Sequence, residues 1–557
     1  MKLKYVLYMA AALSLTGCND SFLERGPQNS NDQSFWISVN DLKAYANAFY
    51  GLIPGGVSVL DDTDSDIQVP NDINSFLWGQ YVVPTEGGVW QKSNWQNIRN
   101  INYFMTHYQS VQAAEADVNI YVAEMRFFRA LEYFNKIQLL GDVPWLEVDL
   151  NVDSEELYGP KMKRNQVFQK IIEDLDFAIQ WLPEAGSEEA NRLNKDIARH
   201  VKARFCLNEG THYKYHDELE YASEAEKWLQ MAATESDKLI TSGRYEIYNT
   251  GHPQEDYFNM YRIDDKSDLK EAVLYVDYKT NIREHNMAAA GREAGCGFSK
   301  SFVESFLCSD GLPISLSNKY LGDETMRKET ANRDPRLKQL ILTNDFPTNV
   351  TDDLKDSTFV VNEDEFITQH CFTGYRPIKG FNPIYSQALY MKSSFDGIAY
   401  RYAETLLINA EAKAELNTIT NADLDRTVNQ LRDRVGMPHL TVNVGFTDPK
   451  WPDWGYSLSP VLQEIRRERC IELAGEGFRF NDLKRWKAGK LLNNVLTYVG
   501  KRKPDGNLAI VYPNYTNPDL SYQAGKSRTW EDKMYLYPIP TGELQRNPQL
   551  LPQNPGW

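Results

Sequence analysis

The sequence has few cysteines and few histidines, and it lacks the short motifs that mark the common catalytic sites. Six of its 557 residues are cysteine and eight are histidine, and no two cysteines form a C-x-x-C pair. The absence of that spacing excludes the usual zinc knuckle and dithiol redox site. There is also no H-E-x-x-H, no phosphate-binding P-loop and no G-x-S-x-G nucleophile motif. We therefore expect no metal ion, no cofactor and no enzymatic activity.

Positive charge and long apolar runs are also scarce. Lys and Arg number 60 against 77 Asp and Glu, which gives a formal net charge of −17. Nucleic acids and anionic membrane surfaces both attract basic proteins, so neither is an expected partner. Beyond the N-terminus no stretch approaches the roughly 18 apolar residues that a membrane-spanning helix needs. The sequence therefore predicts no transmembrane helix.

The N-terminus combines a basic flank, a short apolar run and a cysteine. Residues 6–15 are mostly apolar but too few to cross a bilayer, which is typical of a secretory signal. The letters L-T-G-C at 15–18 resemble the bacterial lipobox, whose cysteine is lipidated and becomes the first mature residue. We therefore predict a lipoprotein signal peptide at residues 1–17 and a lipidated, polar tether at 18–35 that starts at Cys18. An ordinary signal peptide with a chance cysteine is the alternative.

Four segments in the first half of the chain have apolar residues at helical spacing. The first, residues 121–140, is followed by Gly141, a residue that ends helices. Residues 168–182 stop at a proline, and the segments 196–210 and 224–243 each end at a glycine. Helices of this length joined by short turns predict stacked helical hairpins, although the strict tetratricopeptide consensus is absent.

The pattern changes near residue 271. Residues 271–279 predict a strand, and residues 280–400 are rich in loops with scattered aromatic residues. Helical spacing returns at 401–416 and again after Ser459, which suits an N-cap because Pro460 follows it at the first helical position. The second half is therefore expected to contain helices separated by a long, irregular segment.

The densest group of charged residues lies between positions 464 and 486. Glu464, Glu468, Glu472 and Glu476 are spaced four apart, so they line one face of a helix, and several arginines alternate with them. A pair of close carboxylates is what a glycoside hydrolase uses as acid and as nucleophile or base. Arginines interleaved with carboxylates more often clamp them in ion pairs. We therefore interpret this group as an ion-paired scaffold and keep a lipid-anchored glycoside hydrolase as the alternative.

Three smaller patterns are compatible with a metal or a disulfide. His212 and His216 are four residues apart, but without H-E-x-x-H we interpret them as solvated or capping side chains. The acidic stretch at 61–66 alternates as calcium loops do, yet the glycine and final glutamate of such loops are missing. Cys296 and Cys308 are candidates for a disulfide in an exported protein. None of the three predicts a metal site.

Long motifs are distributed over nearly the whole chain. They are, in order, CNDSFLERGPQ, WQNIRNINYF, RALEYFNKIQLLGDVP, RDPRL, RYAETLLINAEAKAE, RRERCIELAGEGFRFNDLKRW and the closing YPIP…QNPGW. Together they resemble the motifs of one family, the SusD/RagB-like outer-membrane nutrient-binding lipoproteins of Bacteroidetes. Trp557 stands where the closing motif of the family has tyrosine.

This resemblance implies a mainly α-helical fold, in which tetratricopeptide-like hairpins form a compact scaffold with long irregular loops and a few short strands. An N-terminal SusD-like helical region, 36–270, would pack as one unit with a C-terminal SusD/RagB-like region, 271–557. The resemblance also implies a lipid-anchored protein of the cell outer membrane that faces the exterior, binds an oligo- or polysaccharide and passes it to a SusC-like TonB-dependent transporter. Capture of a peptide or another non-sugar nutrient is the alternative.

The family motifs mark the scaffold, so the candidate ligand residues come from two other stretches. Sugars need flat apolar faces and planar polar groups, and both stretches supply these residue types. Trp78 precedes a glycine outside any helical period, so we expect its ring to be exposed, with loop packing as the alternative for every aromatic. The candidates within 61–90 are Asp64, Asp66, Trp78, Tyr81 and Trp90, and those within 278–286 are Tyr278, Arg283, His285 and Asn286.

Overall fold

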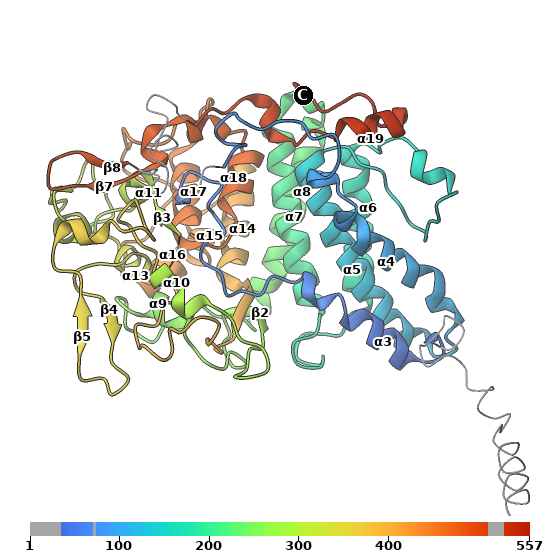
Figure 1. The fold of residues 1–557 in the computed structure, drawn as a ribbon, viewed down its shortest axis with the longest axis horizontal. Coiled ribbons are helices and arrows are strands. Elements are labelled where there is room, and N and C mark those ends of the chain that lie inside the picture. The colour runs from blue at the N-terminus through green and yellow to red at the C-terminus, as the bar shows by residue number, and fades with distance from the viewer. Residues whose placement is uncertain (1–34, 71–73, 294, 511–527) are drawn as a thin grey trace, which may run out of the picture.

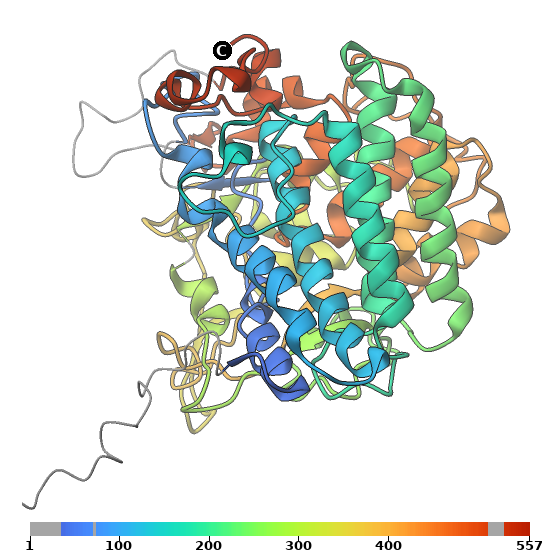
Figure 2. The same cartoon turned by 90° about the vertical axis from the view of Figure 1, so that its right-hand side faces the viewer.

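Long helices fill the N-terminal half of the computed structural model, which describes residues 35–70, 74–293, 295–510 and 528–557 (Figure 1). Figure 2 shows the longest of them standing side by side as one layer. The helices are α3 (Val39–Asn47), α4 (Ser93–His107), α5 (Glu115–Leu140), α6 (Arg164–Trp181), α7 (Lys195–Tyr215) and α8 (Ala222–Ser242). Helix α5 contacts α4 and α6, and α7 contacts α6 and α8. The predicted stack of helical hairpins is confirmed.

Glycines end two of these helices where the sequence predicts it. Gly141 follows α5 with φ of 74°, and Gly243 follows α8 with φ of 67°. Backbone with positive φ costs glycine little and other residues more, which is why glycine is common just past a helix. The spacing of apolar residues therefore predicted the buried faces of α5 and α8, and the glycines predicted their C-terminal ends.

Gly210 does not end α7, which continues to Tyr215. A Cβ atom at this position would lie 2.9 Å from the backbone nitrogen of Leu229 in α8. That distance is too short for any side chain, so the glycine allows α7 and α8 to approach closely. The prediction of a helix end at this glycine was wrong, because the helix-breaking tendency is outweighed by tertiary packing.

The C-terminal half contains shorter helices, long loops and short antiparallel strand pairs, to which residues 68–70 of the N-terminal half add one strand. The strand pairs described are β1 (Gln68–Pro70) with β3 (Cys296–Phe298), β2 (Ala272–Val276) with β6 (Gly397–Arg401), β4 (Pro347–Val350) with β5 (Ser357–Phe359), and β7 (Val499–Arg502) with β8 (Leu508–Ile510). The helices are α9 (Asp256–Met260), α10 (Met287–Glu293), α11 (Lys300–Ser305), α12 (Met326–Thr330), α13 (Arg336–Leu340), α14 (Tyr402–Glu415), α15 (Asn421–Asp425), α16 (Val428–Arg434), α17 (Pro460–Glu472), α18 (Arg479–Arg485) and α19 (Thr541–Arg546). The mainly α fold with a few short strands is confirmed.

Helix α14 joins the two halves. It packs against α7 and α8 on one side and α17 on the other. Its apolar residues belong to the same core as those of α5 to α8, so the largest hydrophobic core contains residues from both sides of position 270. Helix α17 begins as predicted, with the Ser459 hydroxyl accepting a hydrogen bond from the backbone N–H of Leu462 and Pro460 at the first position. The domain boundary at 270/271 stays a prediction.

The charged group at 464–486 is a buried network of ion pairs. The carboxylate of Glu472 is fully buried and accepts hydrogen bonds from Arg336, Arg401 and Arg434 at 3.1, 2.7 and 2.6 Å. Hydrogen bonds between a guanidinium and a carboxylate are charge-assisted and about twice as strong as neutral ones. The predicted ion-paired arrangement is confirmed, and it ties α13, β6 and α16 to the end of α17.

The two histidines and the two cysteines of the candidate disulfide are buried. His212 and His216 are buried, and their rings stack at 4.0 Å between centroids. They are not solvated; His216 is the C-cap residue of α7 and bonds the carbonyl of Lys484. Cys296 and Cys308 are both free thiols, so the disulfide that the sequence allowed is not formed. None of the helices in the described ranges is both long and apolar enough to cross a membrane.

Candidate functional site

The first predicted stretch, 61–90, is used mainly for packing and ion pairing. The carboxylate of Asp66 is 8% exposed and accepts two hydrogen bonds from Arg479, at 2.7 and 2.8 Å. Asp64 is exposed and accepts a hydrogen bond of 2.5 Å from the Asn74 amide. Asp66 therefore has a structural role as the partner of Arg479. Of the two carboxylates, only that of Asp64 is exposed to solvent.

The aromatic residues of this stretch do not form an open surface. Trp78 is 7% exposed and meets the ring of Tyr498 edge-on at 5.5 Å, so the expectation of an exposed ring was wrong. Tyr81 is half-buried and packs edge-on against Trp557 at 5.7 Å. Trp90 is half-buried and lies beside Trp95, which belongs to helix α4. Segments more than 400 residues further along the chain cover Trp78 and Tyr81, which no local pattern could reveal.

The second predicted stretch, 278–286, brings two of its candidates into contact. A tight turn closes with the backbone N–H of Lys279 donating to the carbonyl of Arg283 at 2.8 Å, and Asn281 at its tip has φ of 62°. Asparagine is one of the few residues that adopt this left-handed conformation readily. The turn places the Arg283 guanidinium over the Tyr278 ring at 4.5 Å. The pair leaves an exposed cation beside a half-buried aromatic face.

His285 and Asn286 anchor the turn to neighbouring backbone through hydrogen bonds. His285 is buried, its Nδ1 accepts from the backbone N–H of Met287 at 3.1 Å, and its Nε2 donates to the carbonyl of Phe395 at 2.9 Å. Burial lowers the pKa of His285 to about 4, so the ring is neutral at pH 7. The Asn286 side-chain oxygen accepts from the backbone N–H of Met391 at 3.2 Å. Both side chains fix loops, and His285 is buried whereas Asn286 is half-buried.

A second loop, residues 385–394, runs beside the turn and carries residues that the sequence analysis missed. Its backbone pairs with the turn through His285 and Ser393, at 2.9 and 3.1 Å, and Lys392 forms an ion pair with Glu284 at 3.3 Å. Tyr390 is 73% exposed, an unusual value for an aromatic residue. The only sequence signal was the run of apolar residues within a loop-rich segment. Other exposed apolar side chains of the two loops are Ile282, Tyr385, Leu389 and Met391.

We call the exposed surface of residues 278–286 and 385–394 the loop platform. The β4–β5 hairpin supports its far end, because the backbone N–H of Tyr385 donates to the carbonyl of Val350 at 3.0 Å. Arg292 donates to the Asn349 amide oxygen at 2.9 Å and lies 5.5 Å from the Tyr385 ring. The platform therefore combines aromatic faces with guanidinium and amide groups that are held by a fixed hydrogen-bond framework.

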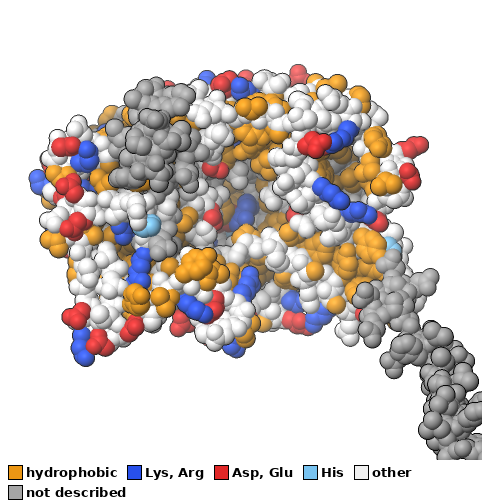
Figure 3. All heavy atoms as spheres, in the orientation of Figure 1, with side chains coloured by type: hydrophobic (Ala, Val, Ile, Leu, Met, Phe, Trp, Pro, Cys, Tyr) orange, Lys and Arg blue, Asp and Glu red, His pale blue; other side chains and the backbone are white. Residues whose placement is uncertain are grey.

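The platform loops carry Lys279, Arg283 and Lys392 against one acid, Glu284, which pairs with Lys392. Acidic and basic side chains alternate over the face in Figure 3, which has no broad patch of one sign and is hollowed near its centre. Among the residues that the structure describes, no three His, Cys, Asp or Glu side chains come together as a metal site would require. The platform can offer stacking and hydrogen bonds to a flat, polar ligand.

The described part of the chain is a mainly helical scaffold with a loop surface that carries exposed aromatic side chains. A sequence model of the SusD family matches residues 242–557, which is more than half of the chain. The chain belongs to the SusD family.

Relatives of known sequence and structure agree with this assignment. The SusD-like protein P2 of Formosa agariphila is 24% identical over the full length of both chains. A SusD-like protein of Bacteroides fragilis has a solved structure with a TM-score of 0.72 and 24% identity, covering 95% of this chain and 99% of the other. A second structure from the same organism, titled a SusD-like carbohydrate binding protein, has a TM-score of 0.70 and 20% identity, covering 93% and 100%. These similarities show a common fold.

Proposed function

We propose that this protein binds an oligo- or polysaccharide on the loop platform. The observation that carries the proposal is the exposed Tyr390 ring on a loop fixed to the turn that holds Tyr278 and Arg283. Sugar rings present an apolar face that stacks on aromatic side chains and hydroxyls that bond planar polar groups. Two solved relatives support the ligand class by their titles, a SusD-like carbohydrate binding protein and a laminarin binding SusD-like protein with a TM-score of 0.54.

The glutamate-rich segment supports binding over hydrolysis. A glycoside hydrolase needs one carboxylic acid with a raised pKa to protonate the leaving group. The arginines around Glu472 do the opposite and hold its pKa well below the usual range, despite its burial. The same guanidinium groups occupy both carboxylate oxygens. The carboxylate is therefore a structural anion, and we propose that the protein is not an enzyme.

We further propose that a lipid on Cys18 holds the protein at the outer face of the cell outer membrane, where it delivers the glycan to a SusC-like TonB-dependent transporter. Family membership and the lipobox-like sequence support this part of the proposal. Cys18 lies outside the described residues. Loops tied together by backbone hydrogen bonds suit capture, because pre-organised groups lose less conformational freedom on binding.

Capture of a peptide is the second candidate, because an exposed tyrosine beside an arginine also suits peptides. Affinity electrophoresis against starch, laminarin, xylan, mannan and pectin, together with a casein peptide digest, separates the two. We expect Tyr390→Ala to weaken binding of one polysaccharide about two- to tenfold, the size of a lost aromatic contact.

Tyr158→Ala is the matched control, because Tyr158 is 52% exposed on the helical half, in the short helix Glu155–Tyr158. It should bind as the wild type does. Binding of casein peptides alone would select the peptide function. Equal polysaccharide affinity of the wild type and Tyr390→Ala would remove the loop platform as the site.

A further inference from the structure

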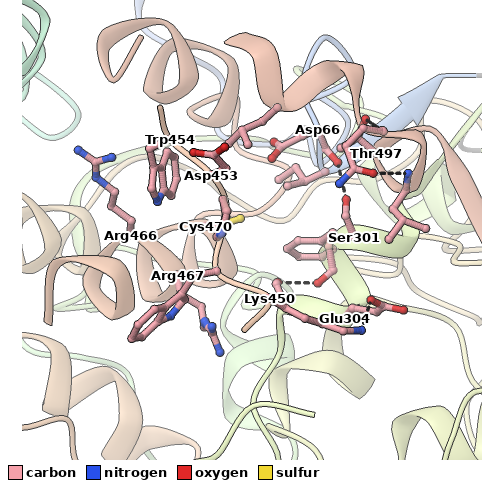
Figure 4. A pocket seen from close by; sticks show the side chains of 18 of the residues that line it. Asp66, Ser301, Glu304, Lys450, Asp453, Trp454, Arg466, Arg467, Cys470 and Thr497 are labelled. Atoms are coloured by element: carbon pink, nitrogen blue, oxygen red, sulfur yellow. Dashed lines mark hydrogen bonds and ion pairs between the residues drawn. The ribbon is translucent and has the colours of Figure 1, made fainter. Parts of the chain in front are cut away.

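A second cavity lies apart from the loop platform, between α11, α17 and the loop 448–454 (Figure 4). Its volume is about 550 Å³, and none of its lining residues belongs to the platform. Small-ligand pockets commonly enclose about 300–1,000 Å³, so this cavity has room for a ligand of one or two sugar units and not for a polymer. We call it the tryptophan pocket after Trp451 and Trp454, which line it.

Both indoles are fixed by hydrogen bonds at their edges. The Nε1–H of Trp451 donates to Glu464 at 2.8 Å, and that of Trp454 donates to Gln463 at 2.7 Å. Because the N–H groups are already satisfied, the rings can contribute apolar surface without leaving a polar atom unpaired. Trp454 is buried and Trp451 is half-buried, so Trp451 is the indole that a ligand can cover further.

Most of the charges that line the pocket are paired with one another. Arg467 pairs with Asp448 at 2.6 Å, and Arg479 pairs with Asp66 at 2.7 Å. Figure 4 shows Lys450 reaching toward Glu304 at the edge of the cavity, and this pair is 2.9 Å apart. Each cation is thus neutralised locally by a carboxylate. The inner walls therefore offer hydrogen-bonding groups without a net charge that would select an ion.

Two further charges lie at the rim and have opposite signs. Lys490 and Asp453 are both exposed, and neither forms an ion pair with any residue in the described part of the chain. An anionic ligand would meet Asp453 and a cationic ligand would meet Lys490, whereas a hydroxyl group can bond either. The rim therefore favours a neutral ligand that both donates and accepts hydrogen bonds.

One polar group on the wall has a free bonding position. The Arg467 side chain is 10% exposed, and its Nη1 is buried without a hydrogen-bond partner among the described residues. A buried donor without a partner is costly, so a ligand oxygen that bonds it gains free energy. Arg467 lines the cavity, but Nη1 itself has almost no accessible surface, so a ligand hydroxyl reaches it only if the side chain shifts.

We propose that the tryptophan pocket is a second glycan site, which takes one or two units of a neutral sugar and is separate from the loop platform. This inference rests on the proposed function and adds a ligand class to it. The platform is open and suits a polymer, whereas the pocket is bounded and suits a chain end or a short fragment. A protein with both sites would bind a neutral disaccharide and a polysaccharide at different places.

Saturation-transfer NMR with single disaccharides tests the proposal on the full mature chain. The probes are maltose, cellobiose, laminaribiose, mannobiose and xylobiose, with digalacturonic acid as the charged comparison. We expect at least one neutral disaccharide to bind, and Trp451→Ala to weaken that binding about two- to tenfold. Lys490→Ala should weaken it as well, and since this side chain is exposed, that variant should fold normally. Tyr390→Ala should leave disaccharide binding unchanged.

Trp181→Ala is the control for loss of a half-buried indole, because Trp181 ends α6 outside the pocket. It should bind the disaccharide as the wild type does. The proposal is overturned if no neutral disaccharide binds, if only digalacturonic acid binds, or if Tyr390→Ala loses the disaccharide while Trp451→Ala and Lys490→Ala keep it. In each case polysaccharide binding by the wild type would show separately whether the function proposed for the platform stands.

Discussion

Arg401, the last residue of β6, donates a hydrogen bond of 2.7 Å to the carboxylate of Glu472, the last residue of α17, and both side chains are buried. Arg336 and Arg434 converge on the same carboxylate. Segments that lie 38, 71 and 136 residues before Glu472 are thus held together through one anion. Glu472 therefore stabilises the fold by joining these segments.

We predict that Glu472→Ala destabilises the protein strongly. Removing the carboxylate leaves three buried guanidinium groups without their shared partner, and breaking a buried pair costs about 3–5 kcal/mol. Arg479→Ala should act in the same direction by stranding Asp66. Urea denaturation measures the free energy of unfolding, with Glu226→Ala, at an exposed position of α8, as the control. If the two network variants unfolded like the wild type but lost ligand binding, the structural role would be wrong.

Trp78→Ala should lower stability and leave glycan binding unchanged. The indole is buried against Tyr498, and truncating a buried tryptophan costs about 3–5 kcal/mol. Differential scanning calorimetry paired with polysaccharide titration measures both quantities in one preparation. If the variant had a normal melting temperature and weakened binding, the glycan site would lie in residues 61–90 instead.

Stability should fall below neutral pH partly because of His285. Burial depresses the pKa of its folded form to about 4, whereas a histidine in the unfolded chain titrates near 6.5. Between these values the unfolded state binds a proton that the folded state does not, so the contribution of His285 is complete above pH 6.5 and is lost as pH falls toward 4. The loss should be at most about 1.4 kcal/mol per pH unit.

The His285→Phe variant tests this by replacing the ring with one that packs but does not titrate. Urea denaturation at pH 7, 6 and 5 should show the wild type losing stability relative to the variant as pH falls. A difference between the two proteins that stays constant with pH would show that His285 titrates alike in both states.

We predict that Cys18→Ser prevents membrane anchoring without disturbing the fold. The residue precedes the described core, and a serine cannot carry the thioether-linked lipid. The variant should move from the detergent phase to the aqueous phase in a Triton X-114 partition, with an unchanged melting temperature. Partitioning equal to that of the wild type would refute the lipid anchor.

Sequence patterns predicted the features of this protein that depend on neighbouring residues. The faces of α5 and α8 follow from apolar spacing. The interleaved carboxylates and arginines indicated that the charges are paired, but the arginines that bond Glu472 lie 136, 71 and 38 residues earlier in the chain. The glycine at 210 was misjudged, because its role depends on Leu229 in another helix. Local rules therefore sufficed for helix periodicity but not for the partners of Glu472.

The candidate site was predicted only in part, because exposure depends on contacts between distant segments. Tyr278 and Arg283 do come together, as a five-residue turn dictates. Trp78 is covered by chain more than 400 residues away, so its burial has no local signal. Tyr390 joins the platform only because its loop pairs with residues about 100 positions earlier, as the 105-residue separation of Met391 and Asn286 shows.

Hydrogen–deuterium exchange with and without the polysaccharide that binds most tightly tests the central claim most directly. Backbone amides covered by a ligand exchange more slowly, and peptides from digestion locate the protection along the chain. We predict slower exchange in peptides that span 278–286 and 385–394, and the same protection absent in Tyr390→Ala at equal polysaccharide concentration. Protection confined to peptides from 61–90, with both platform loops exchanging as in the free protein, would contradict the account.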